Sequence, residues 1–142
     1  MMAVFNKFNA FVENLAEGVH NLQSHTLKVM LTNTAPVATN SVRADLTEIA
    51  AGNGYAAGGI APAITSSGQT SGTYKLVLAD VVFTASGGSI GPFRYAVLYN
   101  DTPTSPADPL IGWWDYGSAL TVLNGESLNW DADPTNGVLT LF

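Results

Sequence analysis

The chain of 142 residues contains no cysteine. Disulfide bonds, zinc ribbons and thiol catalysis are therefore excluded, while the redox state of its compartment stays open. Charged residues are also scarce: they make up 11% of the chain, whereas about a quarter is usual in a globular domain. Five basic residues accompany 11 acidic ones, which gives a net charge of −6. Proteins that bind nucleic acid or anionic membranes normally carry a basic patch, so we expect neither partner.

Long apolar runs are missing too. No stretch approaches the ~20 apolar residues of a membrane-spanning helix, and the N-terminus lacks the basic and apolar segments of a signal peptide. We therefore expect intracellular synthesis. Hydrophobic residues nevertheless make up 46% of the chain. A surface with so few charges is poorly solvated, which predicts that partner subunits cover part of it, although Ser, Thr and Asn are an alternative means of keeping it wet.

The chain does contain short apolar stretches separated by turn residues. Four of them, together with all three tryptophans, lie between Gly91 and Phe142. From Phe93 to Tyr99, large apolar residues occupy every second position, the period of a strand with one packed face. Asn124-Gly125 separates two of the stretches and is a strong hairpin signal, because a type I′ turn needs positive φ at both central residues. We expect the four strands to form one sheet layer.

Further strands are expected earlier in the chain, at residues 25–32 and 74–85, the second with a bend at Asp80. The Ser- and Gly-rich residues 66–73 are predicted to form a flexible loop. Residues 102–109 contain three prolines and are predicted to form a rigid surface loop. In all we expect seven or eight strands. This pattern predicts a mainly β fold for residues 25–142, an antiparallel β-sandwich or jelly roll.

Residues 3–23 are the one helix candidate. Apolar residues recur at alternating spacings of three and four, which predicts an amphipathic helix. Two arrangements stay open for this helix. It lies on its own sheet, or residues 1–24 form a helical arm that anchors the protein to neighbouring subunits. In the second arrangement the interface residues are Phe5, Phe8, Phe11, Val12, Leu15 and Val19.

No combination of residues predicts catalysis or metal binding. His20 and His25 lack the i, i+4 spacing of a helical zinc site, and we interpret them as solvent-facing residues at a junction. The segment from Asp131 to Gly137 lacks the central Gly and final Glu of an EF-hand, so an Asp- and Asn-rich turn explains it. The Gly-rich residues 52–59 lack the spacing and the Lys of a phosphate-binding loop. We expect no enzyme, no metal and no cofactor.

Four aromatic residues form a second candidate site. Trp113 and Trp114 are adjacent, so in a strand they face opposite sides of the sheet. Together with Tyr116 and Trp130 they could form either a buried protein interface or a platform on which a carbohydrate stacks. Aromatic residues are enriched at the buried centres of protein contacts, which favours the interface.

Several short motifs follow one another in an order that resembles a group of small virion proteins of tailed bacteriophages. A segment with Glu and Gly-Gly precedes a YAVLYN strand, a PLIGW strand and a final LTL strand in that group. The corresponding stretches are LTEIAAGNGYAAGG, YAVLYND, PLIGWWDYG and GVLTLF. The resemblance covers residues 27–142, and its motifs are turn and core positions, so it implies no catalytic residues.

Members of this group are structural, head-decoration, cement or minor tail proteins. The resemblance therefore implies a virion protein, made in the host cytoplasm, that decorates and cements the outer surface of the capsid. Its partners would be the major capsid protein and further copies of itself, as a dimer or trimer. The alternative is a minor tail or adsorption protein that binds a host glycan through the tryptophan strand.

Overall fold

A computed structural model describes residues 3–142, which form nine strands and one α-helix. One 3-10 turn, Arg43–Asp45, lies in the long connection that follows the second strand. The elements in chain order are β1 (Phe5–Lys7), α1 (Asn9–Ala16), β2 (Leu27–Thr32), β3 (Ile64–Thr70), β4 (Thr73–Leu78), β5 (Val81–Thr84), β6 (Ile90–Asn100), β7 (Leu110–Val122), β8 (Ser127–Trp130) and β9 (Leu139–Leu141).

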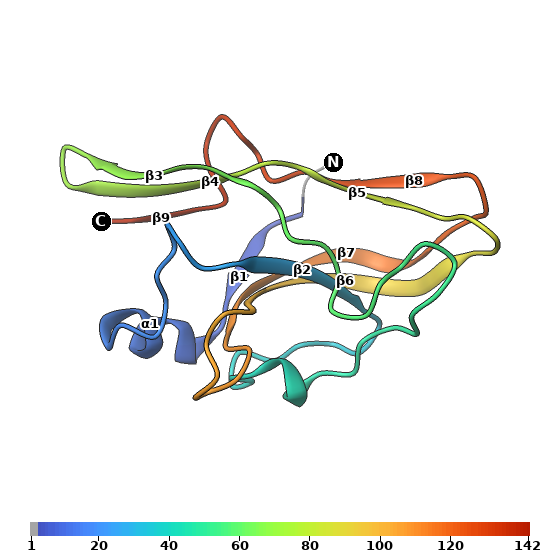
Figure 1. Cartoon of the computed structure of the whole chain (residues 1–142), viewed down its shortest axis with the longest axis horizontal. Helices are drawn as coiled ribbons and strands as arrows, with labels where there is room; N and C mark the ends of the chain where they lie inside the picture. The colour runs from blue at the N-terminus through green and yellow to red at the C-terminus, as the bar shows by residue number, and fades with distance from the viewer. Residues whose placement is uncertain (1–2) are drawn as a thin grey trace.

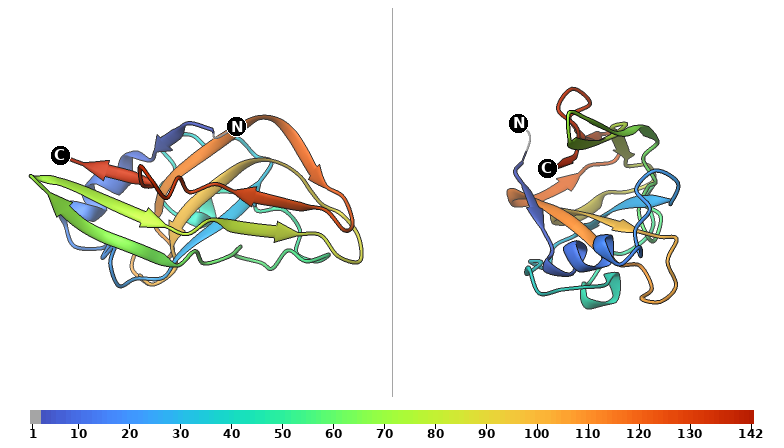
Figure 2. Two further views of the ribbon diagram at one scale, coloured as in Figure 1. Left: turned by 90° about the horizontal axis from the view of Figure 1, so that it is seen from above. Right: turned by 90° about the vertical axis from the view of Figure 1, so that its left-hand side faces the viewer.

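The strands form two facing layers (Figure 1). One layer is a four-stranded sheet of order β1-β7-β6-β2, and the other combines the sheets β3-β4-β9 and β5-β8. Because β4 leads directly into β5, and β8 precedes β9, the two small sheets lie end to end; the end-on view in Figure 2 shows them across from the larger sheet. Every pairing is antiparallel. The prediction of a mainly β, antiparallel, sandwich-like fold is confirmed.

The core strand β6 is packed on both faces, not on one. Phe93 and Leu98 lie in the main core between the layers, whereas Val97 and Tyr99 lie in a second cluster on the outer face of the same sheet. Simple alternation would place Phe93 and Val97 on the same face. Register shifts between Ile90 and Tyr95 explain why they lie on opposite faces, because each bulge changes the face that the following side chains occupy. Part of the connection between β2 and β3 covers that outer face (Figure 1).

The four C-terminal strands are present, but the expectation that they share one sheet layer is wrong. β6 and β7 pair in the large sheet, whereas β8 pairs with β5 and β9 pairs with β4. The turn at Asn124-Gly125 therefore carries the chain from one layer to the other. Its amide at Glu126 donates to the carbonyl of Leu123 at 2.8 Å, and only Gly125 has positive φ, so the turn is not type I′.

Residues 66–73 are not a flexible loop, which corrects a second expectation. They form most of β3 and a two-residue turn into β4, with positive φ at Ser71 and Gly72. Two positive φ values suit the twist of a tight hairpin. Strand β3 was not predicted from the sequence, because most of its side chains are exposed and polar. It therefore lacks the apolar alternation of a packed strand. The strands expected at 25–32 and 74–85, with the bend at Asp80, are confirmed.

The helix predicted for residues 3–23 is much shorter in the structure. Residues Phe5–Lys7 are instead a strand paired with β7, and α1 spans only Asn9–Ala16. Gly18 ends the helix: its φ is +80°, its amide donates to Leu15 and the next amide donates to Asn14. These are the two hydrogen bonds of a Schellman motif, which needs a left-handed residue. Residues 3–24 thus pack with the sandwich, and Met1 and Met2 of the expected arm lie outside the described residues.

Candidate functional site

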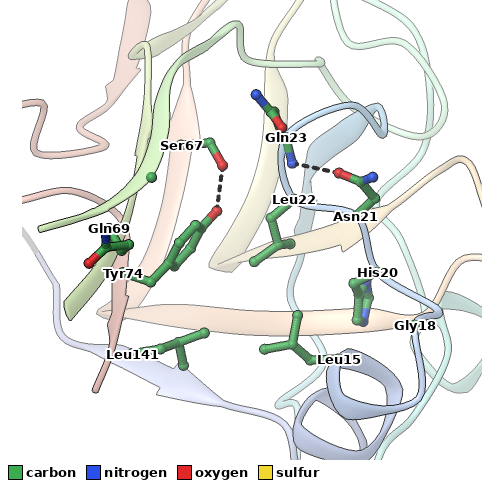
Figure 3. Close-up of a pocket in the computed structure, with 11 residues that line it drawn as sticks. Leu15, Gly18, His20, Asn21, Leu22, Gln23, Ser67, Gln69, Tyr74 and Leu141 are labelled. Atoms are coloured by element: carbon green, nitrogen blue, oxygen red, sulfur yellow. Dashed lines mark hydrogen bonds between the residues drawn. The ribbon is translucent and has the colours of Figure 1, made fainter. Parts of the chain in front are cut away.

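An open cleft with a volume of about 710 Å³ lies at one end of the sandwich. It lies between the inner face of the β3-β4-β9 sheet and the segment that follows α1 (Figure 3). Its apolar walls are Leu15, Leu22, Tyr74 and Leu141, and its polar groups come from Ser67, Gln69 and neighbouring residues. None of the lining residues is an acid, a lysine or an arginine. The cleft therefore suits an uncharged, partly apolar partner segment.

Phe5, Phe8 and Phe11, three of the six residues expected in an anchoring arm, pack against the chain's own sheets. Phe8 is 0% exposed and Phe11 is 2% exposed, and the ring of Phe5 lies 5.3 Å from the ring of Trp114. The chain between β1 and α1 is fixed as well, because the amide of Phe8 donates to the carbonyl of Ile111. Phe8 and Phe11 are consequently covered in the single chain, and Phe5 is partly buried against its core.

The other three arm residues lie closer to the surface. Leu15 is partly buried and lines the cleft, and Val19 is half-buried after the end of α1. Val12 is 50% exposed on α1. Helix α1 and the C-terminus lie at the same end of the molecule (Figure 1). Phe142 is exposed there, and Leu15 of α1 and Leu141 of β9 line the cleft. A partner that approaches this end would meet Val12 and the cleft walls.

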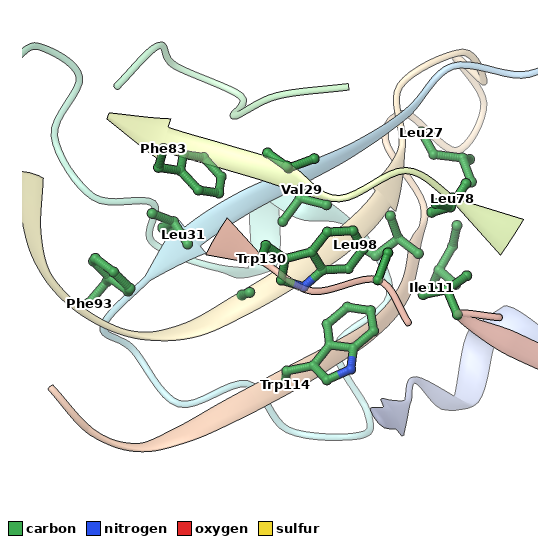
Figure 4. Close-up of a cluster of buried hydrophobic side chains, with 14 of the residues drawn as sticks. Leu27, Val29, Leu31, Leu78, Phe83, Phe93, Leu98, Ile111, Trp114 and Trp130 are labelled. Carbon is green, nitrogen blue, oxygen red and sulfur yellow. The ribbon is translucent and has the colours of Figure 1, made fainter. Parts of the chain in front are cut away.

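The tryptophans do not form a common surface. Trp114 and Trp130 pack edge to face in the core, with ring centroids 5.1 Å apart (Figure 4). Trp113 points to the opposite side of the sheet, as predicted, and its ring lies 4.6 Å from that of Phe8. Tyr116 packs on the core side, and burial raises its pKa to about 12. The four residues therefore offer no shared platform for a sugar ring.

The carboxylate of Glu48 fixes the Gly-rich segment against the sheet. It accepts hydrogen bonds from the Tyr55 hydroxyl and from the Gly58 amide, both at 2.6 Å, and from the Arg43 guanidinium at 2.8 Å. The hydroxyl of Tyr99 then donates to the carbonyl of Gly58 at 2.6 Å. This network joins residues far apart in the chain, and sequence patterns alone did not reveal it.

The pKa directions agree with a structural role for this network. The hydrogen bond that Arg43 donates to Glu48 raises the pKa of Arg43, so the guanidinium stays charged. Burial, and then the hydrogen bond to Glu48, raise the pKa of Tyr55, so its hydroxyl keeps the proton that it donates. A carboxylate that accepts from three donors holds the loop in place.

The interpretation of the histidines as solvent-facing is wrong for His20, which is 5% exposed. The side-chain amide nitrogen of Asn100 lies 3.1 Å from Nδ1 of His20 and 2.9 Å from Nδ1 of His25. An amide nitrogen only donates, so both ring nitrogens accept and neither carries a proton there. Burial, and then the charge of His25, lower the pKa of His20 to about 4. The three residues tie the segment after α1 to the end of β6.

The acidic side chains have structural partners in several places. Asp115 accepts two hydrogen bonds from Arg94, and Lys28 lies 3.2 Å from Asp101. Asp133 accepts from the amide and the side chain of Asn136, which lowers the pKa of its carboxyl and closes the Asp- and Asn-rich turn. Within residues 3–142, no three or more His, Cys, Asp or Glu side chains are placed to hold a metal ion.

None of the helices described between residues 3 and 142 has the length and hydropathy needed to cross a membrane.

The candidate functional site is the open cleft with α1 beside it. Comparison of the chain with protein-family models, curated proteins and solved structures found no match.

Proposed function

We propose that this protein is a structural virion protein that decorates and cements the capsid shell of a tailed bacteriophage. It is made in the host cytoplasm and binds the outer surface of the capsid. Its partners are the major capsid protein and further copies of itself, as a dimer or trimer. By bridging neighbouring capsid subunits it adds buried surface to each junction, which strengthens the shell against the pressure of packaged DNA.

The motif resemblance supports this proposal, since its residues build the sandwich. The YAVLYN stretch is the centre of β6, PLIGW begins β7 and LTL is β9. Glu48 and Gly58 belong to the first motif, and their hydrogen bond fixes the loop over the sheet. A decoration protein requires a rigid scaffold and a docking surface, and these motifs supply the scaffold. The net charge of −6 agrees with a position outside the shell, away from DNA.

The observation that carries the proposal is the uncharged cleft at one end of the molecule, with the exposed Val12 on the same helix as Leu15 of the cleft wall. An uncharged cleft with apolar walls gains free energy when another subunit covers it. A subunit attached by one end leaves the rest of the sandwich free to reach a neighbour. We therefore assign the cleft end to the capsid.

The alternative role, a minor tail or adsorption protein that binds a host glycan, depends on accessible aromatic rings. Trp114 and Trp130 are 5% and 2% exposed, and Trp113 and Tyr116 face opposite sides of the sheet. No specific observation favours this role, so binding to tails or host cells is an outcome of the test.

Co-sedimentation with particles stripped of the protein tests the proposal. We expect the protein to sediment with the shells in a fixed ratio, and Val12→Glu to weaken this binding at least tenfold. Val82→Glu is the matched control, since Val82 is 53% exposed on β5, away from the cleft. Deletion of the N-terminal residues is a poorer test, because it removes Phe8 and Phe11 from the core.

Two results would overturn the proposal. The first is binding to tails or host cells with none to shells, which would favour the adsorption role. The second is binding to shells that Val12→Glu and Val82→Glu affect equally, since the cleft end would then not be the attachment surface.

A further inference from the structure

Strand β3 presents an open sheet edge. It pairs with β4 from Ile64 to Thr70 and is the outer strand of its sheet. No backbone hydrogen bond within residues 3–142 reaches its other side. The residues that close a two-residue hairpin are hydrogen-bonded to each other, and such pairs alternate along the strands. The amide and carbonyl groups of Ser67 and Gln69 therefore point away from β4, ready to pair with another strand.

This edge lacks the protection that sheet edges usually have. Exposed edges normally carry charges or proline, or are covered by another segment, because bare edges pair with other chains. The edge of β2 is covered by bridges to Glu48 and Ile60, and the short edge strand β1 carries Lys7. Residues 63–74, by contrast, contain no charged residue and no proline. The one irregularity of β3 lies at its start, between Ile64 and Ser66.

We propose that two copies of this chain pair through β3, antiparallel, and join their three-stranded sheets into one continuous sheet. Each copy carries a net charge of −6 and repels the other, so a contact between copies requires a neutral edge such as this one. The strand also suits self-pairing. Antiparallel alignment about Ser67 places this residue opposite itself and Ser66 opposite Gly68, with small side chains at the centre and uncharged ones throughout.

The cleft is continuous with this edge. Ser67, Gly68 and Gln69 line the cleft as well as the edge (Figure 3). A second β3 widens the sheet beside these residues and extends that wall of the cleft, while the opposite wall, which includes Leu15 of α1, stays open to the capsid. Backbone pairing supports the dimer. The proposal concerns association between copies and does not depend on the capsid role.

Sedimentation equilibrium of the full chain over a range of concentrations tests the dimer. We expect a reversible dimer, and we expect the double variant Ser66→Lys, Gly68→Lys to weaken it at least tenfold, because lysines then face lysines across the edge. The backbone of Gly68 is not left-handed and its Cβ position is open, so a side chain is tolerated there. The matched control is Ser118→Lys with Thr121→Lys, two exposed positions on β7.

Both double variants lower the net negative charge by two units, so a difference between them cannot come from net charge. A chain that remains a monomer at every concentration overturns the proposal. A dimer that the edge variant and the control affect equally also overturns it, since the contact then lies elsewhere.

Hydrogen exchange provides a test without any substitution. We expect the amides of Ser67 and Gln69 to exchange more slowly as the protein concentration rises, because they become hydrogen-bonded in the dimer. The amides of Ser66 and Gly68 already face β4 and should not respond. A dimer in which the exchange of Ser67 and Gln69 is independent of concentration would rule out pairing through β3.

Discussion

At the scale of single residues, Glu48 joins three parts of the network over the sheet. Its side chain is 15% exposed and receives hydrogen bonds from Arg43, Tyr55 and Gly58. We predict that Glu48→Gln lowers the free energy of unfolding by about 1–3 kcal/mol. The NH₂ group of glutamine would face the Arg43 guanidinium or the Gly58 amide, which only donate, and the network would lose its charged acceptor. Urea denaturation measures the change.

The control for this variant is Glu13→Gln on α1, where the side chain is exposed. A surface substitution of this kind changes stability by at most about 0.5 kcal/mol. Equal effects of the two variants would contradict a fixed role for Glu48.

His20 gives the protein a defined pH dependence. Its pKa is about 4 in the fold and 6.5 as the unperturbed value. Above pH 6.5 both states are neutral at this residue, so it makes no difference. As pH falls from 6.5 to 4, the unfolded chain binds a proton that the folded chain does not, so stability decreases. At about 1.4 kcal/mol per pKa unit, we predict a loss of up to about 3 kcal/mol.

Denaturation curves at several pH values test this prediction against His20→Asn, which keeps an acceptor near Asn100 and removes the titration. The variant should be less stable at pH 7 and should lose less stability between pH 6.5 and 4. Identical slopes for the two proteins over this range would show that His20 is not held neutral.

Neither Glu48 nor Asn100 was predicted to matter, and the reason is physical. The partners of Asn100, His20 and His25, lie 80 and 75 residues away in the chain, and a single buried polar residue has no periodicity to detect. A buried polar group reveals its role only when its partners are in place. By contrast, the opposite orientations of Trp113 and Trp114 follow from strand geometry alone and were predicted.

At the scale of elements, the N-terminal segment separates core from surface. Phe8, which follows β1 and precedes α1 in the chain, is fully buried, whereas Val12 on α1 is half exposed. We predict that Phe8→Ala costs about 3–5 kcal/mol of unfolding free energy, because it leaves a cavity in the core. Val12→Ala should change stability by at most about 1 kcal/mol, since alanine favours helix and little burial is lost. Chemical denaturation compares the two. Equally small effects would favour a detached arm over a packed segment.

The apolar pattern of this segment was correct, but its interpretation as one long helix was wrong. The alternating spacing from Phe5 to Leu22 passes through a strand, a helix and a turn, each of which buries its own apolar residues in the same core. Gly18, where the helix ends, was the one local signal that could have shortened the prediction. The strands with clear apolar alternation were found, whereas β3 was missed because its side chains are polar and mostly exposed.

Strand pairing was beyond the reach of local pattern. Asn124-Gly125 is a good turn sequence in either arrangement, and the choice between a hairpin and a crossing depends on which strand β8 meets. β8 meets β5, with Val81 opposite Trp130 and Phe83 opposite Leu128. These pairs place Trp130 against Trp114 in the centre of the sandwich. Burial of these two tryptophans thus favours the pairing of β8 with β5. Because Trp114 and Trp130 come from different strands, no local pattern predicts their contact.

At the scale of the whole molecule, low charge, an open cleft and a bare sheet edge lie together. The cleft is lined by no acid, lysine or arginine, and the edge strand β3 that borders it carries none either. The cation–carboxylate pairs lie elsewhere, at Lys28, Arg43 and Arg94. The distribution gives the protein a neutral cleft and a neutral sheet edge suited to contacts with other subunits.

Heating DNA-filled particles with and without the protein gives the sharpest test of the proposed cementing role. Particles stripped of the protein are reloaded with the wild type or with Val12→Glu, and DNA release is followed by dye fluorescence as temperature rises. We expect the wild type to raise the release temperature and the variant to raise it less at the same concentration. Full occupancy of the shell with no change in the release temperature would contradict it.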